Sequence, residues 1–172
     1  ADKTIYADDT PVGMEFTLTY LGEKHKVKLS NTIGTQHMYA VCAGIAVAIE
    51  LGVSISRAVA NVQTVQTPNG RMRLIPGLKS SVLVDDTYNS SPIAAESALQ
   101  ALGEVKYAGR KIAVLGDMLE LGKFSAEQHK QIGERVAKTA SVLFTVGVRA
   151  RGIAEGALAA GMKEANIFQF DE

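Results

Sequence analysis

A chain of 172 residues, 47% of them hydrophobic, is long enough to bury a sizeable core in one domain, or in one domain and part of another. Lysine plus arginine and aspartate plus glutamate each number 18, so the formal net charge is zero. This balance argues against a nucleic-acid-binding protein, which carries a basic excess on one face, and favours a protein that handles small molecules.

The sequence predicts a cytoplasmic protein without a membrane partner. A single cysteine, Cys42, cannot form an internal disulfide, which fits a reducing compartment. No basic and apolar signal segment opens the chain, and the longest apolar run, residues 39–49, is too short to span a bilayer. Because the chain begins without methionine and ends just after an apolar run, we expect a piece of a longer protein.

The first part of the chain predicts a β-hairpin followed by two helices. Alternating apolar and polar residues at 13–29 predict two antiparallel strands around a turn at Gly22. Residues 38–51 are apolar nearly all round, and we expect this helix to be buried. Ser54 is a suitable N-cap for a second, amphipathic helix. A breaker cluster at residues 68–70 then predicts a linker at a domain boundary.

From about residue 80 onward, short apolar runs alternate with helical patterns. The runs that predict strands are 82–84, 112–115, 142–146 and 167–170. The segments that predict helices are 92–102, which Ser91 and Pro92 would open, 126–138, which has a capping-box spacing from Ser125 to Gln128, and 150–160. Continuous apolar strands that alternate with helices are typical of a parallel sheet covered on both faces. We therefore predict an α/β fold with a Rossmann-like, mostly parallel sheet. Because its fourth strand ends two residues before the chain does, we expect this domain to be incomplete.

Two polar loops follow the first two of these strands, DDTYNSSP at 85–92 and GDMLELG at 116–122. Ligands of open α/β sheets bind beyond the carboxyl ends of the strands, so neighbouring strands would bring both loops to one edge. There they could hold a ribose hydroxyl, a metal-bound phosphate or an ammonium group. The alternative, which composition alone favours, is that the first loop only turns and caps. Asp85 and Asp86 should point to opposite faces, so we expect one of them to reach the ligand.

Other residues give weaker signals. His25, His37 and His129 lack the spacing of zinc ligands, and we expect surface or capping roles for them and no metal ligand in this chain. The segment GVRARG at 147–152 lacks the glycine spacing of a dinucleotide-binding loop. Neither a GxSxG elbow nor a GxxxxGK[ST] phosphate loop occurs in the chain.

Four segments occur in a diagnostic order. They are Gly34-Thr-Gln-His37 at the start of the apolar helix, Gly70-Arg71-Met72, DDTYNSSP, and GRKIAVLGDMLELG. This order resembles the Mur ligases of peptidoglycan synthesis, and the last two segments are most similar to the MurF type. That type joins D-alanyl-D-alanine to a UDP-N-acetylmuramoyl tripeptide and cleaves ATP to ADP and phosphate. The resemblance runs from about residue 10 to the end.

The resemblance implies a two-part organisation. Residues 1–67 would end the central ATPase domain, and residues 68–172 would form most of the Rossmann-like C-terminal domain. The phosphate loop and the Mg²⁺ ligands would lie upstream, so we expect the chain alone to be inactive. The implied enzyme is a monomeric, ATP- and Mg²⁺-dependent carbon–nitrogen ligase that forms an acyl phosphate. The alternatives are a Mur ligase that adds a single amino acid, against which GDMLELG argues, and a non-catalytic Rossmann-like binding module.

The resemblance also implies roles for individual residues. Arg71 matches the linker arginine near the ATP phosphates and Asp86 the aspartate that holds the nucleotide, and these two are the implied catalytic residues. The implied nucleotide-binding residues are His37, Arg71, Asp86, Tyr88 and Asn89. The implied substrate-binding residues are Asn89, Ser90, Asp117 and Glu120.

The chain departs from the family near the adenine. Family members usually carry asparagine at the positions of Met38 and Val41. Neither side chain can replace an amide group, which both donates and accepts hydrogen bonds. We therefore expect adenine recognition to rest on backbone groups, or the nucleotide preference to be relaxed.

Overall fold

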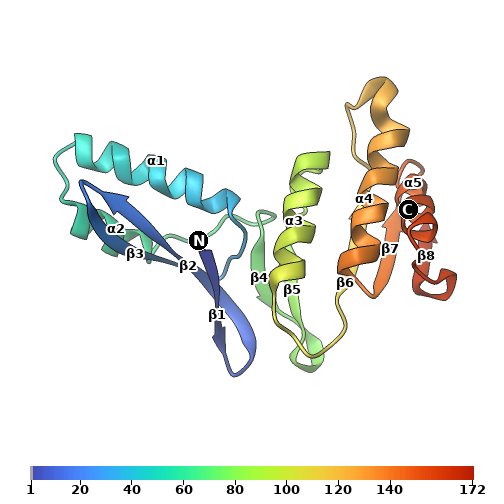
Figure 1. The fold of residues 1–172 in the computed structure, drawn as a ribbon, viewed down its shortest axis with the longest axis horizontal. Coiled ribbons are helices and arrows are strands. Elements are labelled where there is room, and N and C mark those ends of the chain that lie inside the picture. The colour runs from blue at the N-terminus through green and yellow to red at the C-terminus, as the bar shows by residue number, and fades with distance from the viewer. Residues whose placement is uncertain (1) are drawn as a thin grey trace. The chain divides into compact units, whose positions relative to one another are not determined.

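The computed structural model describes residues 2–172, and the chain divides into two compact units between Tyr88 and Asn89 (Figure 1). Each unit has secondary structure and a hydrophobic core cluster of its own. The domain boundary predicted between residues 67 and 68 stays a prediction, because the compact units of a chain need not coincide with the domains of a longer protein.

The first unit contains an antiparallel sheet of three strands in the order β1-β2-β3. The strands are β1 (Asp2–Ala7), β2 (Thr10–Tyr20) and β3 (Glu23–Ser30). The predicted hairpin between β2 and β3 is confirmed, whereas β1 was not predicted. Leu21 and Gly22 both have positive φ, as the tight turns that match the twist of paired strands require. Met14, Phe16 and Val27 are buried on one face of this sheet, which is the packed face that the alternation predicted.

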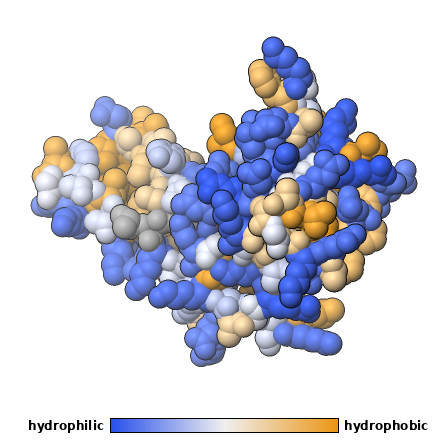
Figure 2. All heavy atoms as spheres, turned by 45° about the vertical axis from the view of Figure 1, so that its right-hand side comes forward, coloured by the Kyte–Doolittle hydropathy of each residue, from blue (hydrophilic) through white to orange (hydrophobic). Residues whose placement is uncertain are grey.

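Two helices follow, α1 (Gln36–Glu50) and α2 (Ile55–Val62), both close to their predicted positions. Ser54 caps α2 as predicted, because its hydroxyl accepts a hydrogen bond from the Arg57 N–H. The predicted burial of the first helix is wrong: among the described residues of α1, Ile45 alone is fully buried, while Tyr39 is 79% exposed. One stripe of α1 packs on the core cluster, and no described residue covers the rest of its apolar surface. Figure 2 shows hydrophobic side chains gathered over this part of the chain.

The linker region contains a further hairpin that the sequence did not predict. β4 (Arg73–Pro76) pairs antiparallel with β5 (Val82–Asp85) in a separate two-stranded sheet. The turn between them holds Lys79 and Ser80 at positive φ. The run at 82–84 is therefore a strand, as predicted, but its assignment to the parallel sheet is wrong, because the backbone groups of β4 are its hydrogen-bonding partners.

The second unit is the α/β part of the molecule, and its fold class is confirmed. Its parallel sheet has the order β6-β7-β8, formed by β6 (Ile112–Gly116), β7 (Val142–Val146) and β8 (Ile167–Phe170). Its helices are α3 (Pro92–Glu104), α4 (Ser125–Thr139) and α5 (Arg151–Ala159). α4 packs on α3 and α5, and α5 packs on β7 and β8. All the predicted helices and the remaining strands are thus present.

In the second unit, one of the two predicted helix caps is confirmed. Ser91 accepts a hydrogen bond from the Ala94 N–H, and Pro92 is the first residue of α3, as predicted. The capping box predicted at the start of α4 is wrong, because a 3-10 turn, Gly122–Phe124, runs directly into the helix and no side chain caps it. The preceding turn already continues the helical backbone, which leaves no extended N-cap residue at Ser125.

The faces of the parallel sheet differ in exposure. Ala113, Leu143 and Thr145 lie on the buried face, whereas Val114 and Phe168 on the other face are 64% and 43% exposed. The rings of Phe144 and Phe168 stack there with their centroids 4.9 Å apart. The described residues thus cover only one face of the sheet. The prediction that both faces are covered is wrong for this part of the chain. Among residues 2–172, every helix is too short or too polar to cross a membrane.

Candidate functional site

The linker at residues 70–72 is held by both carboxylates at the end of β5. Asp85 accepts a hydrogen bond from the Gly70 N–H at 2.9 Å, and Asp86 accepts one from the Met72 N–H at 3.1 Å. A carboxylate accepts from several donors at once, so Asp85 also accepts from the Thr87 hydroxyl at 2.7 Å. The two neighbouring aspartates therefore hold alternate residues of one linker.

Gly70 lies close to Tyr88, which follows β5. Its φ is +70°, and its carbonyl accepts a hydrogen bond from the Tyr88 N–H at 3.2 Å. A Cβ added at this position would lie 2.8 Å from the Tyr88 nitrogen. Glycine is thus required here both by the backbone conformation and by the space available.

The linker is also tied to the start of α1. The Thr32 hydroxyl donates to the Met72 carbonyl at 3.0 Å and lies 2.8 Å from Nε2 of His37. Because Thr32 has one hydroxyl hydrogen, which Met72 receives, Nε2 of His37 carries a hydrogen and donates to Thr32. Sequence reasoning missed Thr32, since nothing in NTIG marks a threonine that will be buried beside a distant linker. We call Thr32, His37, Gly70, Met72, Asp85 and Asp86 the linker network.

The ionisable groups of the linker network have pKa values that shift in different directions. Hydrogen bonds, first from the Thr87 hydroxyl and then from the Gly70 N–H, lower the pKa of Asp85. Burial raises the pKa of Asp86, against the opposing effects of the Met72 N–H and the Arg71 guanidinium. Burial also lowers the pKa of His37, although the Asp86 carboxylate favours the imidazolium. The two adjacent carboxylates thus differ: the pKa of Asp85 lies below its ordinary value, and burial holds the pKa of Asp86 above it.

This arrangement predicts the titration of His37. We expect its ring resonances to titrate with a midpoint below the ordinary value of about 6.5, because burial disfavours the charged ring. Asp86→Asn removes the anion that favours the imidazolium, so the midpoint should fall further. Asp85→Asn is the matched control, because it removes the same charge from the neighbouring carboxylate, which is not among the groups that shift the pKa of His37. The His37 midpoint should be unchanged in this variant. NMR titration measures all three proteins, and a midpoint that rises in Asp86→Asn contradicts the assignment.

Arg71 and Tyr88 stack at the solvent side of the linker. The guanidinium carbon lies 4.2 Å from the centroid of the Tyr88 ring, and both side chains are exposed. This is a cation–π contact, and the guanidinium N–H donors can bind a phosphate or carboxylate. Arg71 thus lies near Asp86 against the Tyr88 ring, and its exposed guanidinium can bind an anion.

The structure brings four of the predicted site residues together in the first unit, namely His37, Arg71, Asp86 and Tyr88. The others, Asn89, Ser90, Asp117 and Glu120, belong to the second unit. Asn89 accepts from the Ser90 N–H, which is a turn contact. Asp117 accepts from the Ala150 N–H at 2.7 Å, and Glu120 is exposed.

The histidines do not lie where the sequence predicted. His129 is fully buried in α4, and His37 is half-buried in the linker network, so the surface or capping roles predicted for them are wrong. The His129 ring accepts a hydrogen bond from the Met118 N–H, and the His37 ring lies 2.8 Å from the Thr32 hydroxyl. The spacing of histidines along the chain reveals neither contact. Within residues 2–172, no group of three or more His, Cys, Asp or Glu side chains is placed to hold a metal ion.

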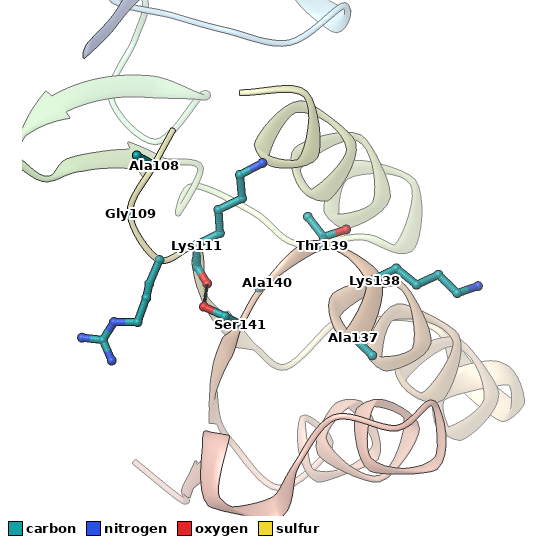
Figure 3. A pocket seen from close by; sticks show the side chains of 9 residues that line it. Ala108, Gly109, Lys111, Ala137, Lys138, Thr139, Ala140 and Ser141 are labelled. Carbon is teal, nitrogen blue, oxygen red and sulfur yellow. Dashed lines mark hydrogen bonds between the residues drawn. The ribbon is translucent and has the colours of Figure 1, made fainter. Parts of the chain in front are cut away.

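A hollow in the second unit contains none of the predicted site residues in its lining (Figure 3). It has a volume of about 540 Å³ and is lined by residues 108–111 and 137–141. Ser141 donates to the Lys111 carbonyl beside it, at 3.1 Å. These residues precede β6 and β7, whereas ligands of open α/β sheets bind beyond the other ends of the strands. The hollow is therefore not part of the candidate site.

The parallel sheet with its helical crossovers defines this protein as a Rossmann-like α/β protein, and Arg71 lies close to Asp86 in the segment that precedes this sheet along the chain. The family model of the Mur ligase, glutamate ligase domain, matches residues 70–172. The chain therefore belongs to the Mur ligase family.

Known relatives are similar along most of this chain. The UDP-N-acetylmuramoyl-tripeptide--D-alanyl-D-alanine ligase of Bacillus subtilis (strain 168) is 31% identical over 127 residues, which make up 73% of this chain and 28% of that protein. The ligase of the same name from Mycobacterium leprae (strain TN) is 36% identical over 107 residues, 55% of this chain and 20% of that protein. A crystal structure of MurF from Acinetobacter baumannii is 28% identical with a TM-score of 0.79, covering 94% of this chain and 34% of that one. The chain thus spans about a third or less of the length of these relatives.

Proposed function

We propose that this chain is part of an ATP-dependent ligase that adds D-alanyl-D-alanine to a UDP-N-acetylmuramoyl tripeptide in peptidoglycan synthesis. The observation that carries the proposal is the pairing of the linker with Asp85 and Asp86, which holds Arg71 beside Asp86 in a chain whose relatives are named for this reaction. The segment GDMLELG supports the dipeptide-adding type over the alternative that adds a single amino acid.

In the proposed reaction, a carboxylate oxygen of the tripeptide attacks the γ-phosphorus of ATP, and ADP leaves. The dipeptide amine then attacks the acyl carbon, phosphate leaves, and the new amide nitrogen loses its extra proton. Arg71 binds phosphate oxygens and offsets negative charge as the phosphoryl group moves. Asp86 accepts a nucleotide hydroxyl through the oxygen that does not bind Met72, and His37 with Thr32 keeps the linker in position.

Among the described residues, no group of three or more His, Cys, Asp or Glu side chains is placed to hold Mg²⁺. We place the metal ligands and the phosphate loop in the part of the relatives that this chain does not span. We also propose that residues 1–67 belong to the ATPase domain and residues 68–172 to the C-terminal domain, which the start of the family match at residue 70 supports. The remaining expectations, a cytoplasmic and monomeric enzyme, are part of the same proposal.

We propose that residues of the second unit bind the incoming dipeptide. Asn89 and Ser90 offer polar groups before α3, and Glu120 offers an exposed carboxylate that can bind the dipeptide ammonium group. Asp117 is the weaker candidate of the two acidic residues, because its carboxylate already accepts from Ala150 and lies 3.6 Å from Arg149.

Phosphate release by the complete ligase tests this function. With ATP, Mg²⁺ and the UDP-linked tripeptide, we expect release to depend on D-alanyl-D-alanine and to be at least about tenfold slower with single amino acids, since a site built for two residues leaves polar groups unpaired with one. The 172-residue chain alone should give no release. Preference for a single amino acid would favour the alternative ligase, and release by the short chain would contradict the proposed division of the active site.

A further inference from the structure

His129 is a fully buried histidine whose ring nitrogens both have partners in the described structure. The Met118 N–H donates to Nε2 at 3.0 Å, which means that Nε2 carries no hydrogen. Nδ1 therefore carries the hydrogen of the neutral ring and donates to the Ser125 carbonyl at 2.7 Å. The ring thus joins the first turn of α4 to the backbone of the loop at residues 116–122.

A second contact fixes the same part of this loop from another helix. Asp117 accepts a hydrogen bond from the Ala150 N–H just before α5, and the Met118 side chain is buried in the core cluster with Ala150 and Leu143. Asp117 and Met118 are therefore held by α4, α5 and the core together. The residues that follow are different, because Leu119 is 59% exposed and Glu120 is exposed with φ at +62°.

The glycines of GVRARG provide the space for both contacts. A Cβ at Gly147, where φ is +108°, would lie 2.6 Å from the Asp117 carboxyl carbon. A Cβ at Gly152 would lie 3.1 Å from the Cβ of His129. This segment is thus explained by close packing of the 116–122 loop and α4 against the start of α5.

We infer that His129 is a positioning residue, which fixes the backbone of the 116–122 loop so that Glu120 meets the ammonium group of the incoming dipeptide. This inference rests on the proposed function for the identity of the substrate. No apolar side chain at position 129 can accept the Met118 N–H, and an unpaired buried N–H favours movement of the loop toward water. His129 itself does not touch the substrate.

The kinetic test uses His129→Leu in the complete ligase. We expect the KM for D-alanyl-D-alanine to rise about tenfold or more, as a small misplacement of a binding group can cause, while the KM for ATP changes less than about twofold. Glu120→Gln should raise the KM for D-alanyl-D-alanine in the same selective way. The double variant, His129→Leu with Glu120→Gln, should have a KM for the dipeptide close to that of either single variant. Val136→Ala, on a fully buried residue of the same helix, is the matched control and should lower the melting temperature with both KM values unchanged.

Hydrogen exchange of the peptide that covers residues 116–122 tests the positioning separately from the function. His129→Leu should lose protection in this peptide, and Val136→Ala should keep it. If the wild-type ligase has no dipeptide activity, the proposed function fails while this exchange result still decides whether His129 holds the loop. His129→Gln, whose side-chain oxygen can accept the Met118 N–H, should keep part of the wild-type protection of this peptide. This variant provides the test if His129→Leu does not fold. Unchanged exchange, or equal rises in both KM values, would overturn the inference.

Discussion

Replacing Arg71 by alanine in the complete ligase is expected to lower the ligation rate by about tenfold or more. A preorganised cation near the transferring phosphoryl group acts mainly in the transition state, and loss of one such contact commonly costs about 100-fold to 1000-fold. The stacking of Arg71 on Tyr88 supports this role, because it holds the guanidinium before any ligand binds. Steady-state rates with saturating ATP and dipeptide measure the effect.

Two variants sharpen the Arg71 experiment. Arg71→Lys keeps the charge but loses the planar pair of donors, so we expect an intermediate rate. Arg57→Ala removes an arginine of α2 outside the linker network and should leave the rate unchanged. Asp86→Ala should slow ligation by an amount similar to Arg71→Ala, because it removes the Met72 contact together with the proposed nucleotide contact. Wild-type rates for Arg71→Ala would refute its assignment.

Gly70→Ala is expected to destabilise the first unit by about 2 kcal/mol or more. A left-handed conformation alone costs an alanine about 1–2 kcal/mol, and forcing an additional methyl group into packed atoms costs about 1–3 kcal/mol. The new Cβ would lie 2.8 Å from the Tyr88 nitrogen, so the hydrogen bond from Tyr88 to the Gly70 carbonyl must lengthen or break. Denaturant unfolding of the 172-residue chain, followed by a probe in the first unit, measures the loss.

Gly22 provides the matched control for the Gly70 variant. Its φ is +85°, and a Cβ added there meets no atom within 4 Å. Gly22→Ala therefore carries the conformational cost without the collision, and we expect it to lose only about 1–2 kcal/mol. Equal losses in the two variants would mean that the approach of the linker to Tyr88 contributes nothing to stability.

Local rules predicted the elements well where the signal lies within a few residues. The caps at Ser54 and Ser91 and the apolar runs of β6, β7 and β8 were all read correctly, because each depends on neighbouring groups. The resemblance of four short segments also identified the family that the match over residues 70–172 shows. The capping box at Ser125 failed because a preceding 3-10 turn changed the local geometry.

The predictions that failed concern partners far away along the chain. The strand at 82–84 has the composition of a parallel strand, yet its hydrogen-bonding partner is β4, a four-residue strand that the sequence did not predict. The apolar composition of α1 predicts burial, but the described residues pack against one stripe of it. Which strand pairs with which, and which face is covered, depends on the assembled chain and not on periodicity.

The sequence by itself determined the α/β class, the helices, the family resemblance and the candidate residues Arg71 and Asp86. The tertiary structure alone decided that both aspartates hold the linker, that Thr32 joins His37 to Met72, and that His129 holds Met118. The physical reason is that each of these contacts satisfies a backbone N–H or C=O of a distant segment. Such a partnership is set by burial and chain path, and it leaves no periodic pattern in the residues that form it.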